Sequence, residues 1–238
     1  MSAVSEHPGE AHHEDLGGRL NGLRAGVLGA NDGIVSMAGL VVGVAGATTD
    51  VRAILTAGIA GLVAGALSMA GGEYVSVSTQ RDTERAAIQL ERQELEQMPE
   101  QELDELTAIY QKRGLSPELA RRVAEELTAK DPLRAHAEAE LNIDPDRLTS
   151  PWQAAWASFL AFTIGGLLPV IAIALPPVEV RVLACGAAVV AGLVLTGWTA
   201  ARLGSAPVAR AVMRNVGVGV LAMLVTYYVG VVFGITVG

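Results

Sequence analysis

The sequence predicts an all-α membrane protein: five transmembrane helices, with a cytosolic helical metal-binding domain inserted between the second and third. Three observations point to the membrane and the inserted domain. Hydrophobic residues make up 51% of the 238 residues and charged residues only 18%, against about a quarter in typical soluble domains. The mean hydropathy is +0.39. The charges are concentrated, since residues 80–150 hold 17 of the 25 acidic and 10 of the 17 basic residues.

This composition excludes several classes of protein. A single soluble globule and a disordered chain would both be more polar, and the net charge of −8 provides no basic face for a nucleic acid. The single cysteine, Cys185, excludes a disulfide framework and a cysteine-based metal cluster. We therefore expect the lipid bilayer, and no nucleic acid, as a partner.

Five apolar stretches are long enough to cross a bilayer as helices, which takes about 20 residues. They cover approximately residues 23–47, 53–77, 152–175, 180–201 and 211–237. Glycines recur four residues apart within them, at positions 29/33, 39/43, 61/65 and 230/234. This spacing lets helix backbones approach closely, although glycine is also generally enriched in membrane helices. The segments 19–79 and 151–238 thus form the membrane part.

The basic residues indicate the orientation, because cytosolic loops carry an excess of Lys and Arg. With the N-terminus in the cytosol, only Arg52 and Arg181 of the 17 basic residues lie outside. Residues 80–150 are then cytosolic, and the C-terminus is outside. Residues 1–18 are polar and lack the features of a signal peptide, so we predict a disordered tail.

Residues 80–150 are predicted to be helical and to contain three internal helix starts. The second span continues as a helix to about Gln97, and Pro99 begins the next one. Ser116-Pro117 and Asp131-Pro132 each combine an N-cap residue with a proline in the first turn. The last of these helices is expected to reach Leu141.

The glutamates of this block have a helical spacing. Glu91 and Glu94 lie three residues apart, as do Glu102 and Glu105, so each pair shares a helix face. Carboxylate-rich faces hold divalent cations in helical bundles. A solvated acidic face is the alternative, and spacing alone favours it.

A second polar cluster follows, in which His136 and Glu140 lie four residues apart. Imidazole suits borderline metals such as iron and zinc. Taken alone, these residues are more typical of a surface than of a ligand set.

Two carboxylates, Asp32 and Glu73, fall within the apolar spans, where Lys and Arg occur only near the span ends. A charged group at the bilayer centre costs about 2.5–3.5 kcal/mol on insertion scales, which makes such residues functional candidates. Met69 shares a helix face with Glu73, and its thioether is a ligand that transition metals accept. We predict a cation path along Asp32, Met69 and Glu73.

Three runs of sequence resemble the vacuolar iron transporter (VIT) family. They are GANDGIVS at residues 29–36, SMAGGEYVSV at 68–77 with the following Gln80-Arg81-Asp82, and PWQAA at 151–155. The resemblance extends from about Arg19 to the C-terminus. It implies a homodimer that exports Fe²⁺, and often Mn²⁺ or other divalent ions, from the cytosol in exchange for protons.

The resemblance also implies roles for individual residues. The family's path residues fall on Asp32 and Met69, and its metal-binding glutamates fall on Glu91, Glu94, Glu102, Glu105 and Glu140. Plant members carry a Met-Met pair where this chain has His136 and Ala137, so imidazole is expected to replace one ligand.

The sequence thus predicts a proton-coupled exporter of Fe²⁺ that is not an enzyme and has no organic cofactor, with Mn²⁺ and Zn²⁺ as further candidate substrates. We expect it in a bacterial plasma membrane, although a vacuolar membrane would give the same topology. A membrane-anchored iron storage or sensor protein without transport is the alternative. A ferroxidase would need a di-iron cluster that the spacing does not supply.

Overall fold

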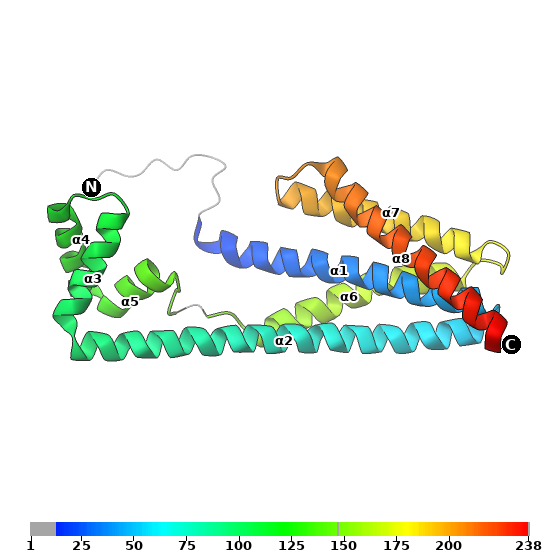
Figure 1. The fold of residues 1–238 in the computed structure, drawn as a ribbon, viewed down its shortest axis with the longest axis horizontal. Coiled ribbons are helices and arrows are strands. Elements are labelled where there is room, and N and C mark those ends of the chain that lie inside the picture. The colour runs from blue at the N-terminus through cyan, green and yellow to red at the C-terminus, as the bar shows by residue number, and fades with distance from the viewer. Residues whose placement is uncertain (1–12, 147, 238) are drawn as a thin grey trace. The chain divides into compact units, whose positions relative to one another are not determined.

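The computed structural model describes residues 13–146 and 148–237, and this part of the chain is helical with no strand (Figure 1). The chain divides into two compact units. Unit 1 comprises the residues up to Tyr74 and from Trp152 onward, and unit 2 comprises Val75–Pro151. Helix α2 (Val51–Gln97) contributes its first part to unit 1 and its second part to unit 2.

Among the described residues, five helices are long and apolar enough to span a membrane, as the sequence predicts, and unit 1 contains them except for the second part of α2. Besides α2 they are α1 (His13–Ala47), α6 (Pro151–Ala174), α7 (Arg181–Leu203) and α8 (Val208–Val237). Helix α1 begins at His13, earlier than expected, so the prediction of a disordered tail does not hold for residues 13–18. Residues 1–12 of that tail lie outside the described residues.

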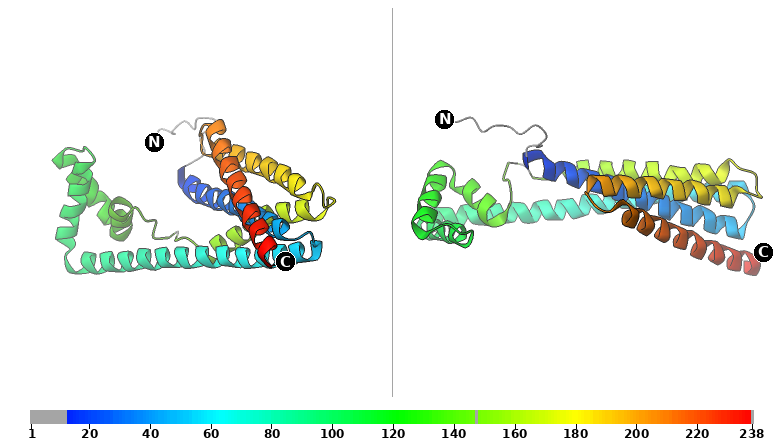
Figure 2. Two further views of the ribbon diagram at one scale, coloured as in Figure 1. Left: turned by 45° about the vertical axis from the view of Figure 1, so that its right-hand side comes forward. Right: turned by 90° about the horizontal axis from the view of Figure 1, so that it is seen from above.

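Close helix crossings hold unit 1 together, and glycines make them possible. A Cβ atom added at Gly33 of α1 would lie 2.3 Å from the carbonyl oxygen of Phe162 in α6. On the α8 side, a Cβ at Gly230 would lie 1.8 Å from the carbonyl oxygen of Gly43. Helices α1, α7 and α8 pack against one another, and α8 runs at an angle across α1 in the left-hand view of Figure 2. The predicted role of the glycine spacing is confirmed at these crossings.

Apolar side chains fill the space between these helices and also cover their outer faces. Met37 of α1, Ile54 of α2 and Leu193 of α7 are among the fully buried members of the core. Other large apolar side chains, such as Ile164 and Leu183, are exposed. In a membrane protein such outward residues face lipid, because lipid tails are as apolar as the side chains themselves.

In unit 2 the second part of α2 is followed by α3 (Pro99–Lys112), α4 (Pro117–Lys130), α5 (Pro132–His136) and the π-helix η1 (Ala137–Leu141). The predicted helix starts are confirmed. The Ser116 hydroxyl accepts a hydrogen bond from the backbone N–H of Leu119 (3.4 Å), and the Asp131 carboxylate accepts one from the backbone N–H of Arg134 (3.0 Å). These caps satisfy N–H groups that the first helical turn leaves free.

The end of this unit differs from the single helix expected between Pro132 and Leu141. The α-helical geometry stops at His136, and a π-helical turn follows and ends at Asn142, whose φ is 54°. Leu106, Ala124 and Ala135 form a small apolar core between α3, α4 and α5. π-Helical turns are rare and frequently occur at functional sites.

We predict that Gly230→Val destabilises the protein, because the new side chain would overlap the α1 backbone at Gly43. Overpacking of this kind typically costs about 1–3 kcal/mol. The midpoint of thermal unfolding in detergent should therefore fall. Gly217→Val is the matched control, since it lies on the same helix and nothing lies within 4 Å of its added Cβ. Equal midpoints for the two variants would contradict the prediction.

Candidate metal centre

Three buried side chains from three helices of unit 2 meet at one point. Glu91 of α2, Glu102 of α3 and His136 of α5 are 3%, 5% and 0% exposed. One ligand atom of each lies within 4.8 Å of the others. We call these three residues the buried cluster.

The imidazole of His136 is the centre of this cluster. Its Nδ1 lies 2.9 Å from Oε1 of Glu91, 3.6 Å from Oε2 of Glu102 and 3.7 Å from Oε2 of Glu140. Despite the 2.9 Å approach, neither Oε1 of Glu91 nor Nδ1 of His136 makes a hydrogen bond. Buried polar atoms are normally paired, and nitrogen and oxygen atoms that converge on one point without a hydrogen bond offer ligands to a cation.

The electrostatics of the cluster lead to the same conclusion. Burial raises the pKa of Glu91 to about 7, and the surrounding negative charges add to this shift, in the order Glu140, Glu102, Glu94 and Glu105. Burial likewise raises the pKa of Glu102, although the nearby His136 lowers it in part. Like charges this close favour protonation, and a bound cation would remove the repulsion.

The predicted ligands therefore occupy different positions. Glu91, Glu102 and His136 form the buried cluster, and Glu140 lies at its edge with a side chain that is 33% exposed. Glu94 is half-buried and Glu105 is exposed, and both act on the cluster through their charge. Reading His136 as a surface residue was wrong, because α5 buries it completely. The alternative interpretation, a solvated acidic helix face, was likewise wrong for Glu91 and Glu102, because both side chains are buried.

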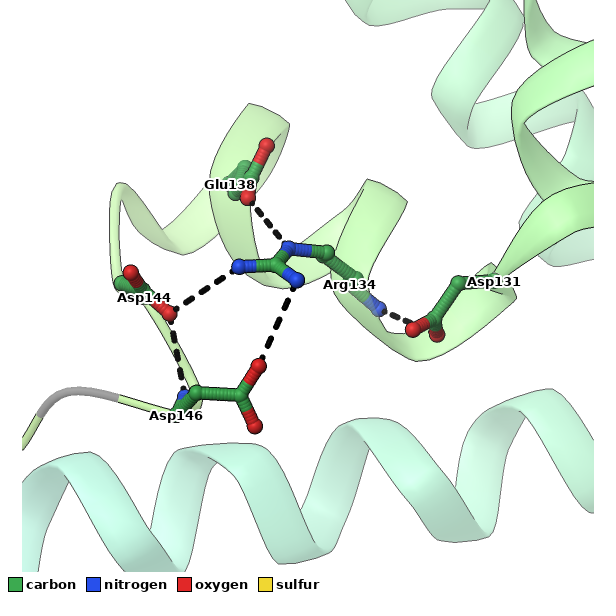
Figure 3. A network of polar contacts seen from close by, with 5 residues as sticks. All are labelled: Asp131, Arg134, Glu138, Asp144 and Asp146. Atoms are coloured by element: carbon green, nitrogen blue, oxygen red, sulfur yellow. Dashed lines mark hydrogen bonds and ion pairs between the residues drawn. The ribbon is translucent and has the colours of Figure 1, made fainter. Parts of the chain in front are cut away.

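Two arginines hold the segment that carries His136 and Glu140. Arg113, at the end of α3, donates a hydrogen bond to the carbonyl oxygen of Ala139 in η1. Arg134 donates to Glu138 (2.8 Å) and to Asp144 (3.4 Å), and it lies 3.3 Å from Asp146 (Figure 3). The network ties the loop after η1 back to α5.

Sequence reasoning missed both arginines. The four-residue spacing of Arg134 and Glu138 was the one available signal, and it is common on solvated helices. The contact from Arg113 to Ala139 spans 26 residues of sequence and leaves no local pattern.

A set of carboxylate oxygens and one imidazole nitrogen suits Fe²⁺, Mn²⁺ and Zn²⁺. Oxygen ligands alone would favour harder ions such as Mg²⁺ and Ca²⁺. The nitrogen of His136 is therefore the group that shifts the preference of the site toward transition metals.

The predicted path residues all lie in unit 1. Asp32 of α1 is half-buried and accepts a hydrogen bond from the Ser36 hydroxyl (2.8 Å). On α2, Met69 packs against the apolar core and Glu73 is half-buried. Among the described side chains, no Lys or Arg forms an ion pair with either acid. Among the described residues, neither Asp32 nor Glu73 belongs to a group like the buried cluster.

Comparison with known proteins shows what the chain is similar to. Residues 23–231 match the family model described as VIT family. A vacuolar iron transporter of Acanthamoeba castellanii is 44% identical over 225 residues, which cover 93% of this chain and 82% of that protein. Vacuolar iron transporter homolog 2 of Arabidopsis thaliana is 37% identical, with 90% and 85% covered. Vacuolar iron transporter homolog 1 of Oryza sativa subsp. japonica is 38% identical, with 98% and 83% covered.

The raised pKa of Glu91 predicts a pH dependence of stability. Between about 4.5 and about 7 the folded state keeps a proton on Glu91 that the unfolded state has released. The stability of the metal-free protein should therefore fall as the pH rises through this range. Urea unfolding at about pH 5 and about pH 8 measures the free energy of unfolding on either side of this range. Glu91→Gln should flatten the slope, and Glu100→Gln, an exposed control, should not. A slope unchanged in Glu91→Gln would refute the assignment.

We further predict that His136→Gln weakens Zn²⁺ binding at least about tenfold and Mn²⁺ binding less, because Zn²⁺ gains more from a nitrogen ligand. Calorimetric titration of the full-length protein with each ion measures both affinities. Glu118→Gln, an exposed position in α4, is the control, and the unfolding midpoint reports whether each variant is folded. An equal loss for both ions would show that His136 does not set the preference.

Proposed function

The chain belongs to the VIT family, and from this premise we propose that it exports Fe²⁺ from the cytosol across the membrane in exchange for protons. The observation that carries the proposal is the buried cluster of Glu91, Glu102 and His136, found in a chain whose other unit consists of helices able to span a bilayer. The protein is then a transporter rather than an enzyme, and the metal is its substrate.

Unit 2 captures the ion in this proposal, and it does so on the cytosolic side. The charge bias supports that side, since the inverted topology would place most basic residues outside. The carboxylates attract divalent cations, while His136 favours transition metals. Mn²⁺ and Zn²⁺ satisfy the same ligands and are further candidate substrates.

Asp32, Met69 and Glu73 form the path through the membrane in this proposal. A carboxylate within an apolar span is stable only when it faces a partner, a cavity or an ion. We propose that two chains associate as a homodimer and that α1 and α2 of both line one path. The second chain would supply ligands that Asp32 and Glu73 lack among the described residues of a single chain.

Competition for carboxylate oxygens provides the coupling. A bound cation lowers the pKa of a carboxylate, whereas loss of the cation from a buried site raises it. Metal and proton therefore replace one another on the same oxygens, and metal binding releases protons. A carboxylate that faces both sides of the membrane in turn would convert this competition into antiport.

In this proposal the protein lies in the plasma membrane, with the N-terminus and unit 2 in the cytosol. A vacuolar membrane would require the same orientation.

The alternative function is a membrane-anchored iron storage or sensor protein. The specific observation that favours it is that the buried cluster is complete within unit 2. Capture of the ion therefore does not depend on the membrane residues.

Transport into proteoliposomes distinguishes the two functions. We expect Fe²⁺ to enter vesicles with an acidic interior while the interior pH rises, because metal uptake and proton release are coupled. Asp32→Asn should abolish both signals, since the amide cannot exchange a proton. Glu179→Gln is the matched control, an exposed carboxylate in the loop between α6 and α7.

Two results would overturn parts of the proposal. Metal flux at the wild-type rate in Asp32→Asn would show that the path is wrong. Stoichiometric metal binding without flux in the wild type would favour the storage or sensor function.

A further inference from the structure

Unit 2 contains a cavity of about 530 Å³ that is separate from the buried cluster. Its wall is formed by one face of α2 and by the loop that follows η1. The lining residues are Arg85, Ile88, Gln89, Arg92, Gln93, Glu96, Pro145 and Leu148. Arg85 and Arg92 lie seven residues apart, which places them on the same helix face about 10 Å apart along the axis. Glu91 points about 100° away from Arg92 around the helix.

Arg85 and Arg92 are exposed, and neither has an acidic partner among the residues that the structure describes. Residues 80–150 contain 17 acidic and 10 basic residues, so carboxylates are plentiful. Arg121 and Arg134 each bind at least two of them. Among the described residues, neither Arg85 nor Arg92 forms an ion pair or a side-chain hydrogen bond. Their guanidinium groups are therefore available to a ligand.

The acids closest in sequence to the cavity wall are already engaged. Asp144 and Asp146, on either side of Pro145, both contact Arg134 (Figure 3). This network holds Pro145 in the cavity wall. It also pairs both carboxylates with Arg134 rather than with the arginines of the cavity. Glu96 is the one carboxylate among the lining residues, and it forms no ion pair with Arg92 although the two lie four residues apart.

The chemistry of the lining selects an anion. Guanidinium groups bind phosphate through two parallel hydrogen bonds, and the amides of Gln89 and Gln93 provide further donors. Ile88 and Leu148 offer apolar contact to an organic group attached to the phosphate. The positive charge excludes metal cations, so the cavity is not a second metal site.

We propose that this cavity binds a phosphate group, with Arg85 and Arg92 as its principal ligands. The phosphate belongs either to the headgroup of an anionic phospholipid or to a soluble phosphate compound. Because guanidinium and phosphate attract one another electrostatically, binding weakens as salt is added.

The test measures binding to the full-length, metal-free protein in detergent. The probes are phosphatidylglycerol, phosphatidylcholine as the lipid without net charge, and inorganic phosphate. The variant is Arg85→Gln with Arg92→Gln, and the control is Arg122→Gln, an exposed arginine of α4 that does not line the cavity. Zn²⁺ binding at the buried cluster reports that each variant is folded. If the double variant does not fold, Arg85→Gln and Arg92→Gln are tested singly.

We expect phosphatidylglycerol or inorganic phosphate to bind, and the double variant to bind at least about tenfold more weakly, because each arginine contributes charge-assisted hydrogen bonds. The control should bind as the wild type does. Binding of phosphatidylglycerol but not of phosphatidylcholine or phosphate identifies a lipid headgroup, and binding of phosphate identifies a soluble ligand. Absence of binding for all probes overturns the proposal. An equal loss in Arg122→Gln also overturns it, since it would reflect net charge alone.

Discussion

Burial of negative charge beside His136 is the constraint on which unit 2 depends. Glu91 and Glu102 are removed from water by three helices, and no hydrogen bond satisfies Oε1 of Glu91. Burying unpaired polar atoms costs free energy of folding, so the surrounding structure has to hold them in place. They are held by the small apolar core around Leu106, by the helix caps and by the hydrogen bond from Arg113 to η1. These supports keep the ligand atoms converged, which limits the rearrangement needed when a cation binds.

A different constraint governs unit 1. Lipid gives helices no hydrophobic reason to associate, so packing at close range has to provide the attraction. Glycines meet this need by letting α1 approach α6 on one side and α8 on the other. Helix α1 is thereby fixed along much of its length, and Asp32 is carried by a helix that has neighbours on two sides. A rigid support of this kind suits the role proposed for Asp32.

The sequence predicts those features that depend on local chemistry. Spans follow from apolar length, and the helices of unit 2 follow from Pro99, Ser116 and Asp131, whose effects act within one turn. Spacing also placed Glu91 and Glu102 among the candidate ligands. The burial of His136 was not predictable, because it depends on α2 and α3, which are distant in sequence. The π-helix and the arginine contacts were missed for the same reason: they depend on tertiary packing rather than on propensity.

Because of the π-helix, the number of residues between His136 and Glu140 also determines how Glu140 faces the buried cluster. A π-helical turn is equivalent to an α-helix that has gained one residue, and it stores that residue as a local bulge. Removing one residue between His136 and Glu140 would let the segment relax to an α-helix and shorten their spacing from four residues to three. The carboxylate of Glu140 would then approach the imidazole from a different angle, even though no ligand had been substituted. In related sequences, a single-residue gap at this point would therefore mark a change in how Glu140 faces the buried cluster.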